Sequence, residues 1–314
     1  MREADQRVLV LGVTSLVGSH FAATWEGGTL EAVGRRDPGS VGLATTHFTQ
    51  LDLSEESRVR RLIRETKCNS VVNYASRTDV DGCERERPSS LSSNGGPSKG
   101  SAWTINGELP GWLAEECAMR GIFMVQISTD FVFDGTSGPY SEDSAPSPFT
   151  ERIGWYGFTK GVGEARVIRV LGPNHSAILR ITHPYGPHFG GKLDFARKLL
   201  QRRLEGKLYP LYVDQQLTPT WIPDVSETVG RILATQSGGT YHVASPSMTT
   251  PYEFAQALFR KYGYDPNAIE GCLLSAVHLS GQAPRPLKGG LRVRNVLKLG
   301  IHPIDFRTGI RLMT

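Results

Sequence analysis

A tyrosine and a lysine four residues apart, Tyr156 and Lys160, are the pair in this chain best suited to acid–base chemistry. On a helix they share one face, one turn apart. An ammonium beside a phenol favours the phenolate and lowers a pKa that starts near ~10. Such a tyrosine can exchange protons near neutral pH. Ser128 and Thr129 follow an apolar run at residues 122–127 and can hold a substrate oxygen beside the tyrosine. The Tyr-x-x-x-Lys spacing alone also occurs on surface helices, so it needs support from the rest of the chain.

A second candidate site is the turn that follows the first apolar run, residues 7–12. It carries Gly12 and Gly18, with Ser15 at the middle position of the pattern Gly-x-x-Gly-x-x-Gly. A strand, a tight glycine turn and a helix aim backbone N–H groups and a helix dipole at a phosphate. We expect Ser15 to offer its N–H and its hydroxyl, although its Cβ crowds close approach to the backbone. An ordinary strand–helix turn is the alternative interpretation.

The ends of the next three apolar runs carry residues that fit other parts of a dinucleotide. Arg35 and Arg36 follow residues 30–34, and arginine at this place suits a ribose 2′-phosphate rather than a free 2′-hydroxyl. They therefore favour NADP over NAD, with a solvated turn as the alternative. Asp52 follows the third run and fits both a helix N-cap and an adenine contact. The fourth run, residues 69–75, ends beside the expected ribose and pyrophosphate in Asn73, Tyr74 and Ala75.

The order of the predicted elements indicates the fold class. Strands and helices alternate up to residue 182, which predicts an α/β Rossmann domain with a doubly wound parallel sheet and right-handed crossovers. Residues 183–314 have a looser pattern and predict a smaller, mixed, mainly substrate-binding region, with segments near 220–245 returning to the Rossmann core. Residues 84–101 are rich in serine, glycine and proline and predict a mobile surface insertion, with an active-site lid as the alternative.

Composition excludes several classes of partner. The 314 residues include 35 basic and 31 acidic side chains without a Lys/Arg block, so there is no electrostatic case for nucleic-acid binding. No apolar run approaches the ~18 residues of a membrane span. The charged residues 1–5 lead straight into an apolar run, which is unlike a signal peptide. The four cysteines lack metal-ligand spacing and suit reduced thiols. We therefore expect a cytoplasmic protein.

Together these residues resemble the extended short-chain dehydrogenase/reductases, and within them the dTDP-4-dehydrorhamnose reductase branch. The most specific match is Ser-Thr-Asp-Phe-Val-Phe-Asp-Gly at residues 128–135 followed by Tyr-Gly-x-x-Lys at 156–160. The resemblance implies an NADPH-dependent reductase of a 4-keto nucleotide sugar. It implies NADP(H) as the preferred cofactor with NAD(H) as the alternative, a nucleotide-sugar substrate as the partner, and a monomer or homodimer.

The resemblance also implies roles for individual residues. Thr129 would hydrogen-bond the substrate carbonyl, Tyr156 would donate its proton, and Lys160 would bind the nicotinamide ribose and tune Tyr156. The implied cofactor-binding residues are Gly12, Thr14, Ser15, Leu16, Val17, Gly18, Arg35, Arg36, Asp52, Leu53, Tyr74, Ala75, Ser76, Ser128, Tyr156 and Lys160. The implied substrate-binding residues are Arg77, Asp130, Phe131, His183 and Gln216.

The chain departs from the family pattern mainly in the substrate region. Phe131 stands where the family has a tyrosine, and His183 stands where it has a tryptophan. Asp194 replaces an asparagine, and we expect its carboxylate to repel a nucleotide diphosphate. Leu217 replaces a glycine. His20 replaces a glutamate that helps bind magnesium in some members, so we expect no metal site of that kind.

Two other functions remain open. A non-catalytic, NADP-binding regulatory subunit like the β subunit of methionine adenosyltransferase shares the fold and many motifs, and Ser15, the 84–101 stretch and the altered pocket are compatible with it. An epimerase or dehydratase is less favoured. Dehydratases usually have an acidic pair after the Ser/Thr position, whereas here only Asp130 follows Thr129.

Overall fold

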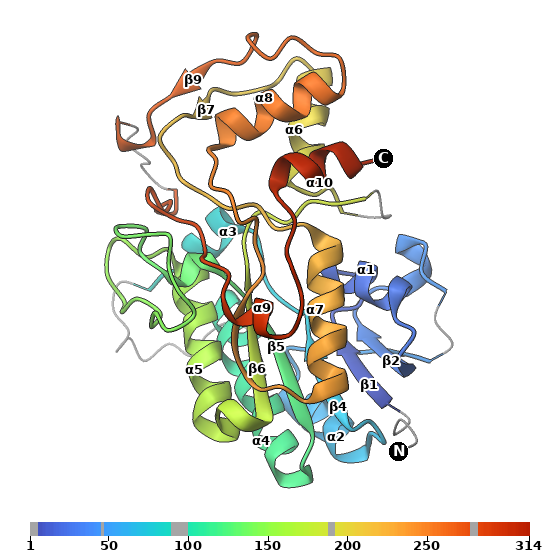
Figure 1. The fold of residues 1–314 in the computed structure, drawn as a ribbon. Coiled ribbons are helices and arrows are strands. Elements are labelled where there is room, and N and C mark those ends of the chain that lie inside the picture. Colours follow the sequence, from blue (N-terminus) through green and yellow to red (C-terminus); the bar gives the residue numbers. More distant parts are fainter. Residues whose placement is uncertain (1–5, 45–46, 89–99, 188–191, 277–281) are drawn as a thin grey trace.

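Seven parallel strands form the central sheet in a computed structural model that describes residues 6–44, 47–88, 100–187, 192–276 and 282–314 (Figure 1). The strand order is β3-β2-β1-β4-β5-β6-β8. The chain thus builds the sheet outward from β1 in one direction and from β4 in the other, and the prediction of a doubly wound parallel sheet is confirmed. The strands are β1 (Gln6–Leu11), β2 (Gly28–Gly34), β3 (Phe48–Gln50), β4 (Ser70–Asn73), β5 (Phe123–Thr129), β6 (Ser176–Ile181) and β8 (Gly239–His242).

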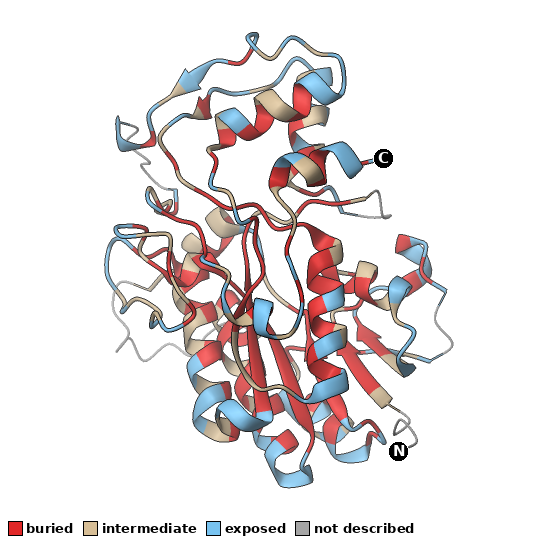
Figure 2. Ribbon diagram, viewed as in Figure 1, coloured by how far each residue is buried: buried red, intermediate tan, exposed pale blue. Residues whose placement is uncertain are grey.

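Helices cover both faces of this sheet because successive side chains of a strand point to opposite faces. In β1, Val8 and Val10 pack in the core layer that α1 and α7 share, and Leu9 and Leu11 pack in the layer of α2, α4 and α5. Figure 2 shows the strands buried between these helices. The covering helices are α1 (Leu16–Thr24), α7 (Ile222–Thr235), α2 (Glu56–Glu65), α4 (Leu109–Arg120) and α5 (Trp155–His175).

A smaller region lies beyond the carboxyl ends of the strands, in the upper part of Figure 1. Its own core is aromatic and includes Phe254, Phe259 and Phe306. It contains α6 (Phe195–Leu204), α8 (Pro251–Lys261), α10 (Phe306–Leu312) and a two-stranded sheet of β7 (Leu211–Tyr212) and β9 (Gly271–Cys272). Between these elements the chain returns to the main sheet, where β8 pairs with β6 and α7 packs beside α1.

Short elements complete the architecture. The π-helical segment η2 leads directly into α4. The 3-10 segment η3 directly follows β5 and so carries the Asp130 end of the Ser-Thr-Asp motif. The remaining elements are η1 (Pro38–Val41), α3 (Val80–Glu84), η2 (Trp103–Glu108), η3 (Asp130–Val132), η4 (Leu274–Ala276) and α9 (Asn295–Lys298).

One local prediction needs correction, and part of another falls outside the described residues. Asp52 is not the N-cap of α2, because that helix starts after Glu55; the Asp52 carboxylate instead accepts hydrogen bonds from the backbone N–H and hydroxyl of Ser54. Of the stretch 84–101, residues 89–99 lie outside the described residues. No helix in the described part of the chain is long and apolar enough to cross a membrane.

Candidate functional site

A cleft of about 330 Å³ opens at the carboxyl ends of the central strands. Its walls come from the β1–α1 turn, the ends of β4 and β5, the first turns of α5, and the segment that runs into α6. Ligand sites of open parallel sheets lie at this edge, where the strand order reverses. The cleft is therefore the candidate active site.

The three predicted catalytic residues meet in this cleft. Thr129 ends β5, and Tyr156 and Lys160 lie on the first two turns of α5. Gly157 allows the close packing of α5 on the segment after β5, since an added Cβ would collide with the Phe131 carbonyl. The Phe131 ring meets the Tyr156 ring edge-on, with 5.8 Å between centroids. Thr129, Tyr156 and Lys160 thus form one cluster because β5 and α5 pack against each other.

The expected lowering of the Tyr156 pKa is not observed. Burial raises the pKa of Tyr156 well above its ordinary value, and hydrogen bonds with Thr129 and Ser76 oppose this shift only in part. The phenol is 9% exposed, so its anion would lose most of its hydration. Tyr156 is therefore a neutral phenol at pH 7, which is the protonation state of a proton donor.

Lys160 lies buried on the same helix face, with an exposed fraction of 4%. Its Nζ donates to the carbonyl oxygen of Ile127 over 2.6 Å, at the end of β5. Burial lowers the pKa of Lys160 to about 8, and the charge of Glu164, one turn further along α5, opposes the shift. The ammonium is thus anchored to the strand that also carries Thr129.

The lowered pKa of Lys160 gives a measurable pH dependence of stability. Between its folded value of about 8 and its ordinary value of 10.5, the unfolded chain binds more protons at this site than the folded protein. Stability contributed by this group therefore rises with pH across that window. From pH 8 to pH 10.5 we expect the free energy of unfolding of the wild type to rise by about 1–3 kcal/mol more than that of Lys160→Met. Urea denaturation of both proteins across this range measures it, and a constant difference would contradict the assignment.

A buried asparagine outside the predicted catalytic set holds the site together. Asn106 lies in the π-helical η2 and is 1% exposed. Its Oδ1 accepts hydrogen bonds from the Ser76 hydroxyl and the Arg77 N–H, both at 2.9 Å. Its Nδ2 donates to the Arg77 carbonyl at 3.1 Å and to the Thr159 hydroxyl at 3.3 Å. Asn106 thus links the segment after β4 to the helix of Tyr156, and the π-helical turn, common at functional sites, presents it.

The glycine turn between β1 and α1 has the geometry of an anion site, and Ser15 caps the helix that follows it. Gly12 has a φ of +75°, and an added Cβ would lie 2.6 Å from the Ala75 nitrogen. The Ser15 N–H donates to the Gly12 carbonyl at 2.9 Å, and the Ser15 Oγ accepts from the Gly18 N–H at 3.1 Å. Ser15 is therefore the N-cap of α1: its N–H is engaged within the turn and its Oγ accepts there, while its O–H can still donate to a group in the cleft that it lines. The N–H groups of Leu16 and Val17, in the first helical turn, are the ones without an intrahelical acceptor.

The two arginines after β2 differ in their placement. The Arg36 guanidinium reaches back to the β1–α1 turn, where Nη2 donates to the Thr14 carbonyl at 3.4 Å. Arg35 is exposed, and its carbonyl accepts from the Gln50 side chain at 2.9 Å. Asp37 accepts a hydrogen bond from Gly39 and caps η1. Arg36 is thus the cation closer to the glycine turn.

Two hydroxyls that face the cleft are buried and have no partner among the described residues: Tyr74 Oη and Ser128 Oγ. Buried polar atoms are nearly always hydrogen-bonded, so these two point to a polar ligand in the cleft. Ser76, another predicted cofactor contact, lines the same wall. Ala75 and Leu53 are buried and do not line the cleft.

Three predicted substrate contacts lie outside the cleft lining. The Arg77 guanidinium pairs with Glu86 at 2.6 Å and donates to the Gly100 carbonyl. Asp130 is 3% exposed, and burial raises its pKa to about 6. Gln216 pairs through its backbone with Leu287 and Gly289. These three residues therefore contact other parts of the protein and do not line the cleft.

The expected effect of Asp194 also needs correction. Its carboxylate caps α6 by accepting from the Arg197 N–H at 2.7 Å, and it forms an ion pair with the Arg197 guanidinium at 2.6 Å. The negative charge is therefore compensated within α6. The aspartate with an arginine three residues later is the sequence signal for this pairing. Sequence reasoning missed Lys192 and Lys198, which line the cleft on either side of Asp194.

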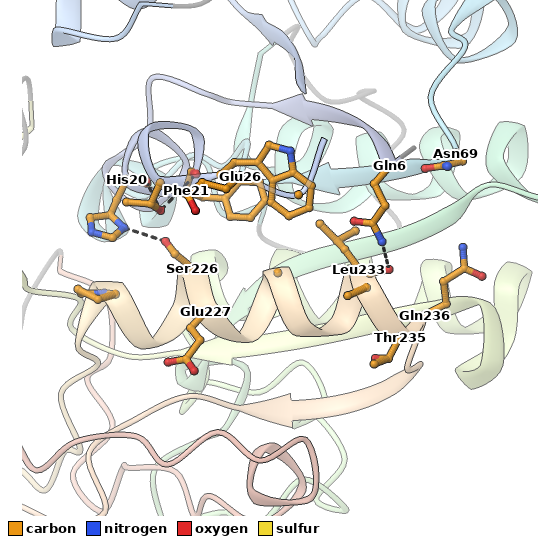
Figure 3. Close-up of a pocket in the computed structure, with 16 residues that line it drawn as sticks. Gln6, His20, Phe21, Glu26, Asn69, Ser226, Glu227, Leu233, Thr235 and Gln236 are labelled. Atoms are coloured by element: carbon orange, nitrogen blue, oxygen red, sulfur yellow. Dashed lines mark hydrogen bonds between the residues drawn. The ribbon is translucent and has the colours of Figure 1, made fainter. Parts of the chain in front are cut away.

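A second, larger cavity of about 890 Å³ lies between α1 and α7, and its lining includes none of Thr129, Tyr156 and Lys160 (Figure 3). His20 Nδ1 lies 2.8 Å from the Ser226 Oγ, and the Gln6 side chain donates to the Leu233 carbonyl at 2.7 Å. His20 therefore links two helices. Within the described ranges, no three His, Cys, Asp or Glu side chains are grouped to hold a metal ion.

Comparison with known proteins places the chain in a family. The family model described as the RmlD substrate binding domain matches residues 6–314. The chain belongs to this family. The RmlD-family resemblance inferred from residues 128–135 and 156–160 is therefore confirmed.

Relatives of this RmlD-family chain include reductases and a methionine adenosyltransferase subunit. A probable low-salt glycan biosynthesis reductase, Agl14 of Haloferax volcanii, is 35% identical over 251 residues, 79% of this chain and 77% of that protein. A dTDP-4-dehydrorhamnose reductase of Streptomyces griseus is 29% identical over 304 residues, 95% of this chain and 89% of that protein. The mouse methionine adenosyltransferase 2 subunit beta is 29% identical over 318 residues, 98% of this chain and 86% of that protein.

A solved structure matches the RmlD-family fold over almost its full length. The dTDP-4-dehydrorhamnose reductase of Bacillus anthracis, crystallised with NADP, superposes with a TM-score of 0.78. The alignment covers 99% of this chain and 98% of that one, at 22% identity. This likeness supports the Rossmann-like fold.

The wall where this chain departs most from the RmlD-family pattern is aromatic. His183, which has a positive φ of 41°, lies against Phe131 and Phe195, with ring centroids 6.2 and 5.0 Å away. Its Nδ1 lies 2.8 Å from the Thr182 hydroxyl. Burial, together with the charges of Arg285 and Lys198, lowers the pKa of His183 to about 4. His183 is thus a neutral ring at pH 7, and it lies against Phe131, the residue whose ring also meets Tyr156.

Proposed function

We propose that the protein is an NADPH-dependent reductase of the 4-keto group of a nucleotide sugar. The convergence of Thr129, Tyr156 and Lys160 in one cleft, next to a glycine turn at a helix N-terminus, carries this proposal. Membership of the RmlD family and the reductases among the relatives support it.

The proposed roles follow from the contacts of each side chain. The nicotinamide, when bound, supplies the hydride to the carbonyl carbon. Tyr156 is neutral and gives its proton to the carbonyl oxygen, so that the ketone becomes an alcohol. Thr129, which hydrogen-bonds Tyr156, orients that oxygen. Lys160, anchored to β5, provides the positive charge that stabilises the tyrosinate left behind.

The cleft has groups that fit a dinucleotide. The first-turn N–H groups of Leu16 and Val17 suit the pyrophosphate, since a helix N-terminus carries partial positive charge. The buried hydroxyls of Tyr74 and Ser128 offer hydrogen bonds to the ribose and nicotinamide half. Arg36, which lies over the turn, suits the 2′-phosphate.

Arg36→Ala is expected to weaken NADPH binding about 10-fold or more and to leave NADH binding nearly unchanged, because only NADPH carries the 2′-phosphate. Titration of each cofactor by fluorescence measures the two affinities. Arg35→Ala is the matched control and is expected to have the smaller effect, since of the two guanidinium groups it is that of Arg36 that donates to the Thr14 carbonyl of the glycine turn. Equal losses of NADPH and NADH affinity in Arg36→Ala would show that Arg36 does not recognise the 2′-phosphate.

Turnover tests the proposed function directly. The purified protein is mixed with NADPH and a panel of 4-keto nucleotide sugars that includes dTDP-4-dehydrorhamnose, and NADPH absorbance is followed. We expect oxidation of NADPH with at least one of these sugars and formation of the corresponding alcohol. Absence of turnover with every sugar, under conditions where NADPH binds, would contradict the reductase.

The second candidate is a non-catalytic, NADP-binding regulatory subunit. The mouse methionine adenosyltransferase 2 subunit beta matches 98% of this chain and is the specific observation that favours it. NADPH binding without turnover, together with a measurable complex with a methionine adenosyltransferase catalytic subunit in gel filtration, would support this alternative. The complete Thr129, Tyr156 and Lys160 cluster favours the enzyme.

A further inference from the structure

The cavity between α1 and α7 is long and, among the described residues, shares no lining side chain with the catalytic cleft (Figure 3). Its lining follows α7 from Pro223 to Gln236, which at 1.5 Å per residue is about 20 Å of helix. It also includes Gln6 and Asn69, at the amino ends of β1 and β4, whereas the catalytic cleft opens at the carboxyl ends of the strands. The cavity is therefore suited to an extended ligand.

The lining of this cavity is negatively charged. Glu26 and Glu227 belong to it, and no lysine or arginine does so in the part of the chain that the structure describes. His20 is neutral at pH 7, because burial lowers its pKa. None of the ion pairs recorded within the described ranges includes Glu26 or Glu227. Two carboxylates in an otherwise neutral lining attract a cation and disfavour an anionic nucleotide.

The carboxyl ends of two helices add to this preference for a cation. α1 ends at Thr24 and α7 ends at Thr235, and both residues line the cavity. The last carbonyl groups of a helix carry partial negative charge. The hydroxyls of Thr24 and Thr235 donate to carbonyls of their own helices, and the Gln6 amide donates to the Leu233 carbonyl. These donors are engaged within the protein, which favours a ligand that brings its own donors.

An aromatic wall gives the cavity an apolar surface as well. The Trp25 ring lies 5.2 Å from the Phe21 ring between centroids. Trp25 also faces Gly230 of α7, where an added Cβ would be 3.9 Å from the indole. An indole face attracts an ammonium group, and apolar surface accepts the methylene stem that carries it. The walls therefore suit a chain of methylene groups with ammonium groups along it.

We propose that the cavity between α1 and α7 binds a linear aliphatic polyamine. Its ammonium groups pair with the Glu26 and Glu227 carboxylates, and its methylene chain lies along Trp25. The two carboxylates come from different elements, the segment after α1 and the body of α7, so a ligand with separated charges can reach both. A single metal ion fits less well, because within the described ranges no three His, Cys, Asp or Glu side chains are grouped.

Calorimetric titration of the purified protein with spermidine tests the proposal. We expect saturable binding at one site per chain. Glu26→Gln and Glu227→Gln should each weaken it by about 3- to 10-fold, the range between an exposed ion pair and a charge-assisted hydrogen bond. Glu65→Gln is the matched control, because Glu65 is an exposed glutamate at the end of α2 that does not line the cavity. The control should bind spermidine as the wild type does.

A second variant, Gly230→Leu, blocks the cavity and preserves the helix. The added Cβ would meet only the Trp25 ring, at ordinary contact distance, and leucine is a better helix former than glycine. Urea denaturation should therefore show a fold at least as stable as the wild type. The rest of the leucine side chain enters the space between α1 and α7, so we expect spermidine affinity to fall about 10-fold or more.

Four results would overturn the proposal: no saturable binding of spermidine to the wild type, an equal loss of affinity in Glu65→Gln, undiminished affinity in a folded Gly230→Leu variant, or displacement of spermidine by equimolar Mg²⁺. The last would mean that the carboxylates hold any multivalent cation. Turnover of a sugar enters none of these measurements, so the polyamine site and the reductase can fail separately.

Discussion

Replacement of Tyr156 by phenylalanine is expected to reduce turnover by about 10²- to 10⁴-fold, the range attributed to a positioned general acid. The variant keeps the ring that meets Phe131 edge-on and removes only the hydroxyl, so the cleft should keep its shape. NADPH affinity is therefore expected to stay nearly unchanged. Steady-state kinetics on the substrate found in the panel, with cofactor titration alongside, measures both quantities.

The control for this substitution is Tyr241→Phe, because the Tyr241 hydroxyl donates to the Gly238 carbonyl at the start of β8, outside the cleft lining. It should leave turnover close to the wild type. Turnover in Tyr156→Phe within a few-fold of the wild type would mean that another group delivers the proton. A large loss of NADPH affinity in that variant would mean that the phenol serves mainly in cofactor binding.

Replacement of Arg180 by methionine is expected to destabilise the fold by about 3–5 kcal/mol, the usual cost of breaking a buried ion pair from one side. Arg180 on β6 and Glu164 on α5 are 2% and 1% exposed, and their closest atoms are 2.7 Å apart. Arg180 also donates to the Ser144 carbonyl at 3.2 Å and lies over the Phe133 ring. Its loss would leave the Glu164 carboxylate buried and unpaired.

Urea denaturation of the wild type and the Arg180→Met variant measures this cost. The double variant Glu164→Met/Arg180→Met should recover a large part of the stability, because it leaves no orphan charge. Arg58→Met, in an exposed pair with Glu55 at 3.6 Å, should change stability by no more than about 1 kcal/mol. Equal effects of Arg180→Met and Arg58→Met would show that the buried pair has no special weight. Since Glu164 follows Lys160 by one turn on α5, the pair also fixes the helix that carries Tyr156 and Lys160.

The fold could be predicted because its signals are local. Each strand of the sheet is a short apolar run, and the turn or helix that follows lies next to it in sequence. The alternation of such strands and helices along the chain is therefore enough to predict the doubly wound parallel sheet. The meeting of Thr129, Tyr156 and Lys160 in one cleft was also predictable, since they belong to two motifs that the sequence analysis already read together.

What could not be predicted depends on contacts between distant parts of the chain. The Tyr156 pKa rises because the ring is buried in a cluster with Cys83, Ala102 and Trp155, and the Tyr-x-x-x-Lys spacing holds no information on that burial. Ser15 also forms the N-cap of α1, a role that a serine directly before a helix indicates and that the sequence analysis did not assign to it. Lys198 was overlooked because a lysine on a polar helix reads as solvated until the helix is placed against the cleft.

The return of the chain to the main sheet affects how new specificity could be engineered. α7 packs beside α1, and β8 is an edge strand next to β6. A chimera that took everything after β6 from a relative would replace both the contacts between α7 and α1 and the pairing of β8 with β6. Retargeting to another sugar should therefore transplant two separate inserts, one before α7 and one after β8, and keep the native connection between them.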